Sequence, residues 1–533
     1  MVRRGGGGFP AARHALRGLR LGLLPPRGPP LPQPGLRGRR VGGGPAVAAW
    51  PRLVVHGQPV SAAVTLRERS GTSVGAVRVD RCGAGGRAPR GSGTGGSRGH
   101  RRGPDGGHGG GGRARCAPRG RGNDLDDVAL AADGGEGMTG EVAVLGAGMH
   151  PWGKWGRNFV EYGVAAARAA LTDAGLDWRD IGSIIGADTV RGGYPGYVAG
   201  ATFAKALGWQ GARVTSVYAA CASGAQAVDA ARAQILSGLA EVVLVVGADA
   251  APKGFFRPAG GDRPDDPDWL RFRVLGATNP VYFGLYARRR MALHGDTPGD
   301  FARVKVKNAA MGALNPHARY RRRVTAEEVA ASAVVADPLR LLDICATSDG
   351  GAAVVLSSME FARRHGHADP VRIRAVSTVT PRYPNTVLDL PDIATDSAVA
   401  VDPAAETFRV SIARAAYEEA GVGPEDLSLA EVYDLSTALE LQWYEDLGLC
   451  GEGEGVKLLR DGATALGGRI PVNASGGLAS FGEAVPAQAI AQVCELAWQL
   501  RGEAGDRQVA GARVGISVNQ GLFGHGSALI AVR

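Results

Sequence analysis

From residue 141 onward the sequence alternates between short apolar runs and longer amphipathic runs, and this alternation strongly constrains the fold. The run AEVVLVVGADA at 240–250 is apolar from 242 to 248, so a strand there is buried on both faces. The run VEYGVAAARAALTDAGL at 160–176 has apolar residues at helical spacing and ends with Gly175, a residue type common at helix ends. Buried strands separated by helices are typical of parallel sheets covered by helices, so we predict an α/β fold.

The strand and helix units recur in two successive series. We expect the first series to have strands over 141–148, 181–188, 212–219 and 240–250, with helices over 160–176, 197–209 and 222–238. We expect the second to have strands over 371–379, 427–435, 512–520 and 527–533, with helices over 404–421, 436–449 and 484–502. Each series contains a helix that ends in Ala-Gly, then an acidic turn and a strand (LTDAGLDWRDI and YEEAGVGPEDL). We therefore predict an internal duplication, with halves over 138–365 and 366–533.

The segment 251–300 interrupts this rhythm with aromatic, Pro and Arg residues. We interpret it as an excursion that caps the sheet, a place where substrate contacts are common. The chain then returns to the pattern with a helix over 297–314 and a strand over 351–358.

The first 137 residues differ from the rest in composition. They hold 35 of the 83 glycines and 23 Arg with no Lys, against 8 acidic residues. Such a segment cannot bury enough apolar area to offset the entropy of ordering, so we predict a disordered extension over 1–137 and expect Met138 to be the native start. An Arg/Gly-rich RNA-binding tail is the alternative. Residues 138–533 hold 38 basic and 43 acidic residues, so we expect no nucleic-acid partner for this body.

Two further classes of protein are disfavoured. No run reaches about 18 consecutive apolar residues, so we expect no membrane span. The six cysteines are far apart and form no CxxC pair, so we expect neither a disulfide framework nor a metal site. A reducing, cytoplasmic location follows as our expectation.

Cys221 is the leading candidate for a catalytic residue. A strand-like run leads to it, small residues surround it, and a predicted helix follows. Free N–H groups at a helix N-terminus stabilise a thiolate and can also hold an oxyanion when a thioester is attacked. The alternative is a small buried residue where a strand and a helix pack closely.

Four motifs in order along 140–533 resemble the thiolase superfamily: YAACASGAQAVDAARAQILSG, KNAAMGALNPHARYRRRVTAEEV, LLDICATSDGGAAVV and PVNASGGLASFGEA. Within it the chain resembles sterol-carrier-protein-type thiolases, often labelled lipid-transfer proteins in actinobacteria. The resemblance implies a duplicated five-layer αβαβα fold, a homodimer and acyl-CoA thioester substrates, with no bound cofactor beyond the coenzyme A thioester. It also implies that Cys221 occupies the position of the cysteine that accepts the acyl group.

The other catalytic positions depart from the family pattern. Tyr433 in VYDLS stands where relatives carry His or Asn, and Glu483 in FGEAVP stands where they carry the His that activates the nucleophile. Asn519 is the nearest match to a second catalytic Cys, and His525 follows in the same Gly-rich loop. We predict Cys221, Tyr433, Glu483 and Asn519 as the catalytic set, because acyl transfer needs groups that remove and return protons.

A second set of residues is predicted to shape the substrate site. It consists of Asn473, Ser475, Gly476, Gly477 and His525. Turn formation is the alternative role for the loop VNASGG, and a packed loop histidine is the alternative for His525. Asp434 and Glu440 follow Tyr433, and we expect them to be a helix cap and part of a solvated face.

Three functions remain open at this point. The first is an acyltransferase that makes or breaks carbon–carbon bonds of acyl-CoA thioesters in lipid or steroid side-chain breakdown. The second is retro-aldol cleavage of a 3-hydroxyacyl-CoA, since thiolase-fold aldolases resemble the chain at Tyr433 and typically need a zinc-ribbon/OB-fold partner. The third is a degenerate thiolase that binds lipid or acyl-CoA without catalysis.

Overall fold

The computed structural model describes residues 140–188, 199–251, 279–381, 407–521 and 525–533, together with two short strands near the N-terminus. Those strands, β1 (Val54–Val55) and β2 (Gln58–Pro59), pair antiparallel within a separate unit over residues 1–121. The predicted disorder of 1–137 otherwise lies outside the described residues. Everything below concerns the larger unit.

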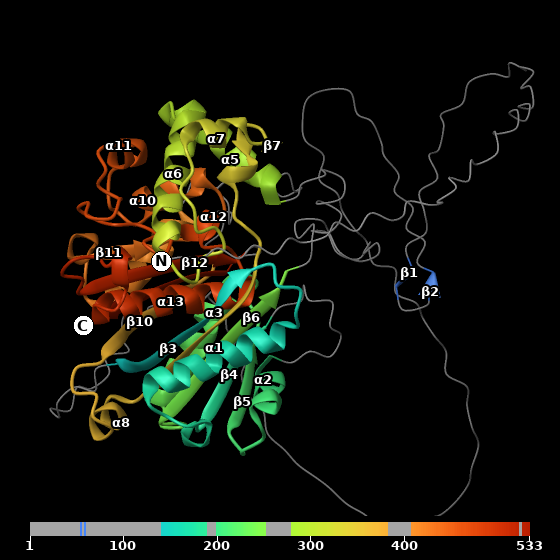
Figure 1. Ribbon diagram of the computed structural model, residues 1–533, viewed down its shortest axis with the longest axis vertical. Helices are drawn as coiled ribbons and strands as arrows, with labels where there is room; N and C mark the ends of the chain where they lie inside the picture. The colour runs from blue at the N-terminus through green and yellow to red at the C-terminus, as the bar shows by residue number, and fades with distance from the viewer. Residues whose placement is uncertain are drawn as a thin grey trace, which may run out of the picture. The chain divides into compact units, whose positions relative to one another are not determined.

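A nine-stranded mixed sheet forms the centre of this unit (Figure 1). Its strand order is β11-β12-β13-β10-β3-β9-β6-β4-β5. The strands are β3 (Val142–Gly153), β4 (Ser183–Ala187), β5 (Arg213–Val217), β6 (Val242–Ala250), β9 (Asp349–Ser357), β10 (Val371–Val379), β11 (Leu429–Glu431), β12 (Val514–Gly521) and β13 (His525–Val532). The predicted burial of the 240–250 strand is confirmed, but the parallel sheet is only partly right: β6 is parallel to β4 and antiparallel to β9.

The two halves of the sheet repeat one topology. In the first half β4 is parallel to β6, and β9 is antiparallel to both β6 and β3. In the second half β11 is parallel to β12, and β13 is antiparallel to both β12 and β10. A short antiparallel pairing of β3 with β10 joins the halves. Four strands of each half share this order and these directions, which agrees with the predicted duplication, and β5, parallel to β4, has no counterpart among the described strands of the second half.

Helices form three layers around these strands. The helices α3 (Ser223–Leu236) and α13 (Val485–Arg501) contact each other and strands of both halves, so they form the shared central layer. The helices α1 (Phe159–Ala174) and α2 (Ala199–Leu207) cover the outer face of the first half, and α9 (Phe408–Ala420) covers that of the second. This arrangement is the predicted five-layer αβαβα architecture.

The remaining elements extend beyond the sheet. They are α5 (Asn279–His294), α6 (Pro298–Leu314), α7 (Ala326–Ala331), β7 (Val334–Ala336), β8 (Leu339–Arg340), α8 (Met359–Arg364), α10 (Thr437–Asp446), α11 (Gly455–Arg460) and α12 (Gly477–Ser480). The excursion predicted over 251–300 therefore contains a regular helix, α5, and residues 252–278 of it lie outside the described residues.

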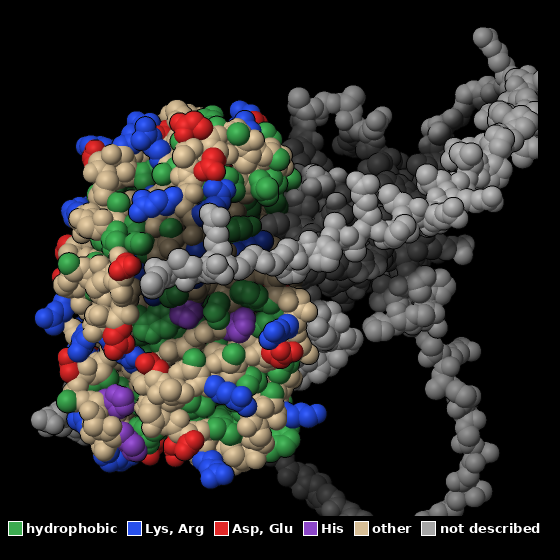
Figure 2. Space-filling model, in the orientation of Figure 1, with side chains coloured by type: hydrophobic (Ala, Val, Ile, Leu, Met, Phe, Trp, Pro, Cys, Tyr) green, Lys and Arg blue, Asp and Glu red, His purple; other side chains and the backbone are tan. Residues whose placement is uncertain are grey.

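Surface charge on this unit is mixed. On the face in Figure 2, Lys and Arg side chains lie among Asp and Glu side chains, and neither sign forms a continuous field. None of the helices in the described ranges has both the length and the apolar composition that a bilayer span requires.

Candidate active site

Cys221 lies in the turn between β5 and α3. Ala220 has a positive φ of 49°, which reverses the chain sharply before the cysteine. The hydroxyl of Ser223 accepts a hydrogen bond from Ala219 N at 2.8 Å and donates to the carbonyl oxygen of Ala220 at 2.6 Å, so the turn is tied on both sides. The cysteine is buried just ahead of the first turn of the 14-residue helix α3. Cys221 therefore directly precedes the N-cap residue Ala222, at the positive end of the helix dipole, where the sequence analysis expects it.

Glu483 is held rigidly between α12 and α13. Its backbone N–H donates to Ala346 at 2.9 Å, and its carbonyl oxygen accepts from Ser348 N at 2.7 Å. The segment 346–348 thus fixes the glutamate backbone like a short strand partner. These two backbone hydrogen bonds fix the point from which the side chain extends.

Three side chains converge on the Glu483 carboxylate. Tyr433 donates its hydroxyl proton to Oε1 at 2.8 Å, and the sulfur of Cys221 lies 3.9 Å from the same oxygen. The sulfur of Cys345 lies 3.2 Å from Oε2. All four side chains are buried. We refer to Cys221, Tyr433, Glu483 and Cys345 as the carboxylate cluster.

Tyr433 enters this cluster from the end of β11. Its ring is buried, and Trp443 Nε1 donates to its carbonyl oxygen at 3.1 Å. Burial raises the pKa of the Tyr433 hydroxyl well above its ordinary value, and the neighbouring Cys221 and Glu483 raise it further. The hydroxyl is therefore protonated at neutral pH and acts as a hydrogen-bond donor.

Cys345 is the member that sequence reasoning missed. Burial raises the pKa of its thiol well above the ordinary value, and the charge of Glu483 adds to this effect, so the thiol stays protonated. The residue stands within LLDICATSDGGAAVV, but nothing in that stretch indicates which partner its side chain meets. Only the fold brings it to a glutamate that lies 138 positions further along the chain.

Asp434 and Glu440 correct one sequence-based expectation. Both carboxylates are fully buried rather than capping or solvated. Glu440 forms an ion pair with Lys307 at 2.7 Å, and Asp434 accepts from Leu478 N at 2.7 Å. Asn308 donates to both carboxylates. These contacts join α6 and α10 to α12, which lies shortly before Glu483 in the chain.

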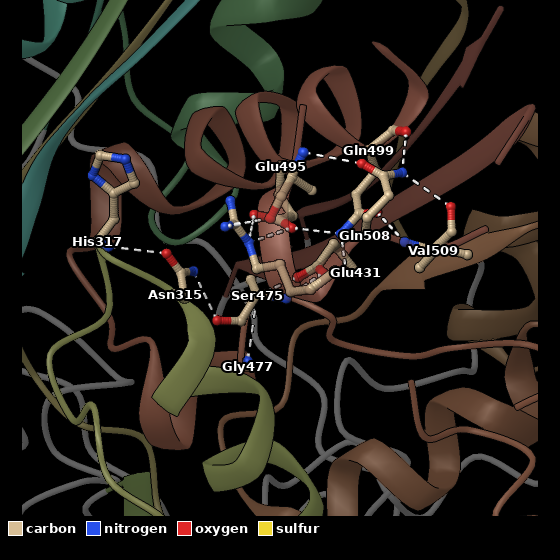
Figure 3. Close-up of polar contacts among 11 residues, drawn as sticks. Asn315, His317, Glu431, Ser475, Gly477, Glu495, Gln499, Gln508 and Val509 are labelled. Atoms are coloured by element: carbon tan, nitrogen blue, oxygen red, sulfur yellow. Dashed lines mark hydrogen bonds and ion pairs between the residues drawn. The ribbon is translucent and has the colours of Figure 1, made fainter. Parts of the chain in front are cut away.

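The loop 473–477 also forms hydrogen bonds with buried carboxylates. Asn473 has a φ of 58° and bonds Val432 N and Glu440 through its side chain. Ser475 donates to both oxygens of Glu431, through its N–H at 2.9 Å and its hydroxyl at 2.6 Å (Figure 3). Gly477 has a φ of 60°, and a Cβ there would lie 2.5 Å from Asp434 Oδ2. These contacts match the turn-forming alternative, and a substrate role for the loop, including Gly476, stays a prediction.

His317 lies beside this loop in Figure 3. Its backbone N–H donates to Asn315, whose side-chain nitrogen donates to the carbonyl oxygen of Ser475 at 2.9 Å. The imidazole stacks on the ring of Trp498 with centroids 5.3 Å apart. Burial lowers the pKa of His317 to about 4, and the charge of Arg507 acts in the same direction. This histidine is therefore neutral at physiological pH.

The structure does not bring Asn519 into the carboxylate cluster. Its side-chain nitrogen donates to Gln492 of α13 at 2.6 Å. The end of its strand does approach the nucleophile, since a Cβ on Gly521 would lie 2.6 Å from the carbonyl oxygen of Ala219. His525 pairs with Gly521 at the start of β13, and residues 522–524 between them lie outside the described residues. Within the described ranges, no three His, Cys, Asp or Glu side chains are arranged to hold a metal ion.

Comparisons with known proteins agree with this fold. Residues 142–251 match the family described as thiolase, N-terminal domain, and residues 395–532 match the thiolase C-terminal domain-like family. An acetyl-CoA acetyltransferase of Methanothermobacter thermautotrophicus is 33% identical over 395 residues, which covers 72% of this chain and 97% of that protein. Human sterol carrier protein 2 is 34% identical over 400 residues, covering 72% and 70% of the two chains. The chain belongs to the thiolase family.

One solved structure that is similar to this chain carries the name of an aldolase. A complex named Ltp2-ChsH2(DUF35) aldolase aligns with a TM-score of 0.63 and 26% sequence identity, covering 74% of this chain and 98% of that chain. The resemblance to thiolases and to the sterol-carrier-protein branch is thus confirmed, and both thiolase and aldolase names occur among the similar proteins.

Proposed function

We propose that this protein is an acyl-CoA acyltransferase of the thiolase type, in which Cys221 accepts the acyl group and Glu483 is the general base. The observation that carries the proposal is the convergence of Cys221 and Tyr433 on one oxygen of the buried Glu483 carboxylate. A thiol must lose its proton to attack a carbonyl, and the carboxylate is placed to receive it. Glu483 thereby takes the part that the resemblance gives to a histidine.

The proposed reaction with a 3-ketoacyl-CoA balances as follows. Glu483 takes the Cys221 proton, the thiolate attacks the keto carbon, and amides at the α3 N-terminus hold the oxyanion. Cleavage of the adjacent carbon–carbon bond leaves acyl-Cys221 and an acetyl-CoA enolate, which recovers the proton from Glu483. The thiol of free coenzyme A then attacks the acyl group, and its proton returns to Cys221 through Glu483. Tyr433 donates a hydrogen bond throughout these transfers.

We propose fatty or steroid side-chain acyl groups as the substrate class. The sterol-carrier-protein relatives support this choice, and Cys221 and Tyr433 belong to one buried hydrophobic cluster of the core. The test is cleavage of 3-ketoacyl-CoA thioesters of graded chain length in the presence of coenzyme A. Formation of two new thioesters supports the proposal, and binding without any bond cleavage favours the third alternative, a non-catalytic acyl-CoA-binding protein.

Retro-aldol cleavage is a second candidate, favoured by the Tyr433–Glu483 pair and by the similar aldolase structure. In this reaction Tyr433 takes the proton of a 3-hydroxyl group and passes its own proton to Glu483. The C2–C3 bond breaks, the carbonyl product leaves, and the thioester enolate takes the proton from Glu483, which returns to its starting form. The expected partner is a zinc-ribbon/OB-fold protein. Release of a ketone or aldehyde from a 3-hydroxyacyl-CoA only when such a partner is co-expressed would select this reaction.

We also propose a homodimer that forms along β5. Among the described strands β5 ends the sheet, with β4 as its one neighbour in the strand order. Val214 on this strand is 42% exposed, and Trp209 just before it is 67% exposed. A second copy paired along this edge would cover both side chains. Val214→Lys should convert the dimer to a monomer in light scattering, whereas an unchanged mass would exclude this edge.

A further inference from the structure

Cys345 belongs to a segment that connects the two sides of the carboxylate cluster. Its backbone N–H donates to Leu435 at 3.0 Å, two residues after Tyr433. Ala346, the next residue, accepts from the N–H of Glu483 at 2.9 Å. The segment therefore links the chain that carries Tyr433 to the chain that carries Glu483, and Cys345 lies between them.

The Cys345 thiol has one proton to donate, and the Glu483 carboxylate is 3.2 Å away. The thiol does not compete with Cys221 as a nucleophile, because burial and the nearby carboxylate keep it protonated. Its contact is to Oε2, whereas Tyr433 and Cys221 both meet Oε1. The two carboxylate oxygens thus have different partners, which fixes the rotation of the carboxylate plane.

We propose that Cys345 is a positioning residue for the base: its thiol engages Oε2 of Glu483 and so presents Oε1 to Cys221 and Tyr433. This inference rests on the proposed role of Glu483 as base. A hydrogen bond to the charged form of a carboxylate also stabilises that form. Cys345 therefore supports Glu483 as the acceptor of the Cys221 proton.

Other charged groups bear on this cluster. Asp434 raises the pKa of the Cys345 thiol through its negative charge, and Lys305 of α6 faces Asp434 in turn. Asp434 and Lys305 stay unchanged in every Cys345 variant, so their electrostatic effect on the cluster is the same in all of them. Cys221 and Tyr433 are likewise unchanged.

The test measures the alkylation rate of Cys221 by iodoacetamide against pH, with each cysteine followed by peptide mass spectrometry. The lower limb of this profile reports the first apparent pKa of the Cys221–Glu483 pair. Cys345→Ala and Cys345→Val both remove the donor, and Val also restores volume. We expect both variants to move the lower limb of the alkylation profile to higher pH, by about one pH unit. Cys345→Ser retains a donor and should leave the limb near its wild-type position.

Cys494→Ala is the matched control, because that thiol is also buried but lies within hydrogen-bonding distance of backbone carbonyl oxygens, those of Gly148 and Ala353, rather than of a carboxylate. It should leave the limb unchanged. Equal limbs in the Ala, Val and wild-type proteins, or a Ser variant that shifts as far as Val, would overturn the proposal and leave Cys345 a packing residue. The assay uses no substrate, so it stays informative if the acyltransferase activity itself is not found.

Discussion

Glu483→Gln tests the core of the proposed chemistry. The carboxylate offers two acceptor oxygens to Tyr433 at 2.8 Å, Cys345 at 3.2 Å and Cys221 at 3.9 Å. An amide of the same shape offers one acceptor oxygen and an NH₂ group that cannot take a proton. Whichever way the amide is turned, its NH₂ group faces either the tyrosine hydroxyl or the Cys345 thiol.

The expected effects differ in size. One mismatched buried hydrogen bond costs about 1–3 kcal/mol of stability, which the large fold tolerates. Loss of the general base should lower the rate of Cys221 acylation by about 10²–10⁴-fold. The assay pairs rapid-quench acylation by acyl-CoA with thermal unfolding, so that lost chemistry is distinguished from lost folding.

Glu431→Gln is the matched control. Burial and the charge of Glu495 raise the pKa of Glu431 to about 8, so this carboxyl group is largely protonated at pH 7 and resembles an amide. It bonds Ser475 rather than a member of the carboxylate cluster. We expect acylation within about threefold of wild type. If Glu483→Gln also stays within that range, Glu483 is not the base.

Three further predictions concern other parts of the site. Tyr433→Phe removes the donor to Glu483 and should slow turnover about 100-fold or more. The control Tyr444→Phe removes a buried donor to Glu440, outside the carboxylate cluster, and should affect stability more than turnover. Equal turnover losses in the two variants would count against a chemical role for Tyr433. The folded-state pKa of His317 is about 4 and the unfolded value about 6.5, so the unfolded state binds more protons between these pH values. The free energy of unfolding therefore falls as the pH decreases through this range, by at most about 3 kcal/mol. His317→Phe should lessen this loss in urea titrations at pH 7 and pH 4.5, and an identical loss would refute the assignment. Gly477→Ala places a Cβ 2.5 Å from Asp434 Oδ2 at a φ of 60° and should cost about 2 kcal/mol or more in chemical unfolding, whereas a neutral result would mean that the loop relaxes freely.

Much of the fold follows from local patterns in the sequence. The helix predicted over 297–314 is α6, because Thr297 caps it and Pro298 suits the first turn. The strand predicted over 427–435 is shorter, with β11 ending at Glu431. The residues after Glu431 leave the sheet, and Asp434 there accepts a hydrogen bond from Leu478 N. Strand propensity cannot predict such a tertiary contact.

The candidate site was predicted unevenly. Strand ends and family motifs mark the positions of Cys221, Tyr433 and Glu483 in the sequence, and the structure brings these three predicted residues together. Cys345 was not found, since a lone cysteine in an apolar stretch is indistinguishable from a packing residue until its partner is known. Glu440 was expected on a solvated face because an acidic residue in a helix is usually exposed, but Lys307 and Asn308 of α6 neutralise and bond it in the interior.

The most direct test of the central claim is an intact-mass measurement after brief incubation with acyl-CoA. The account predicts one added acyl group, located on Cys221 by peptide mapping and absent from Cys221→Ser, with one equivalent of free coenzyme A released. No adduct and no released coenzyme A, from protein that binds acyl-CoA, would contradict the assignment of Cys221 as the acyl-accepting nucleophile.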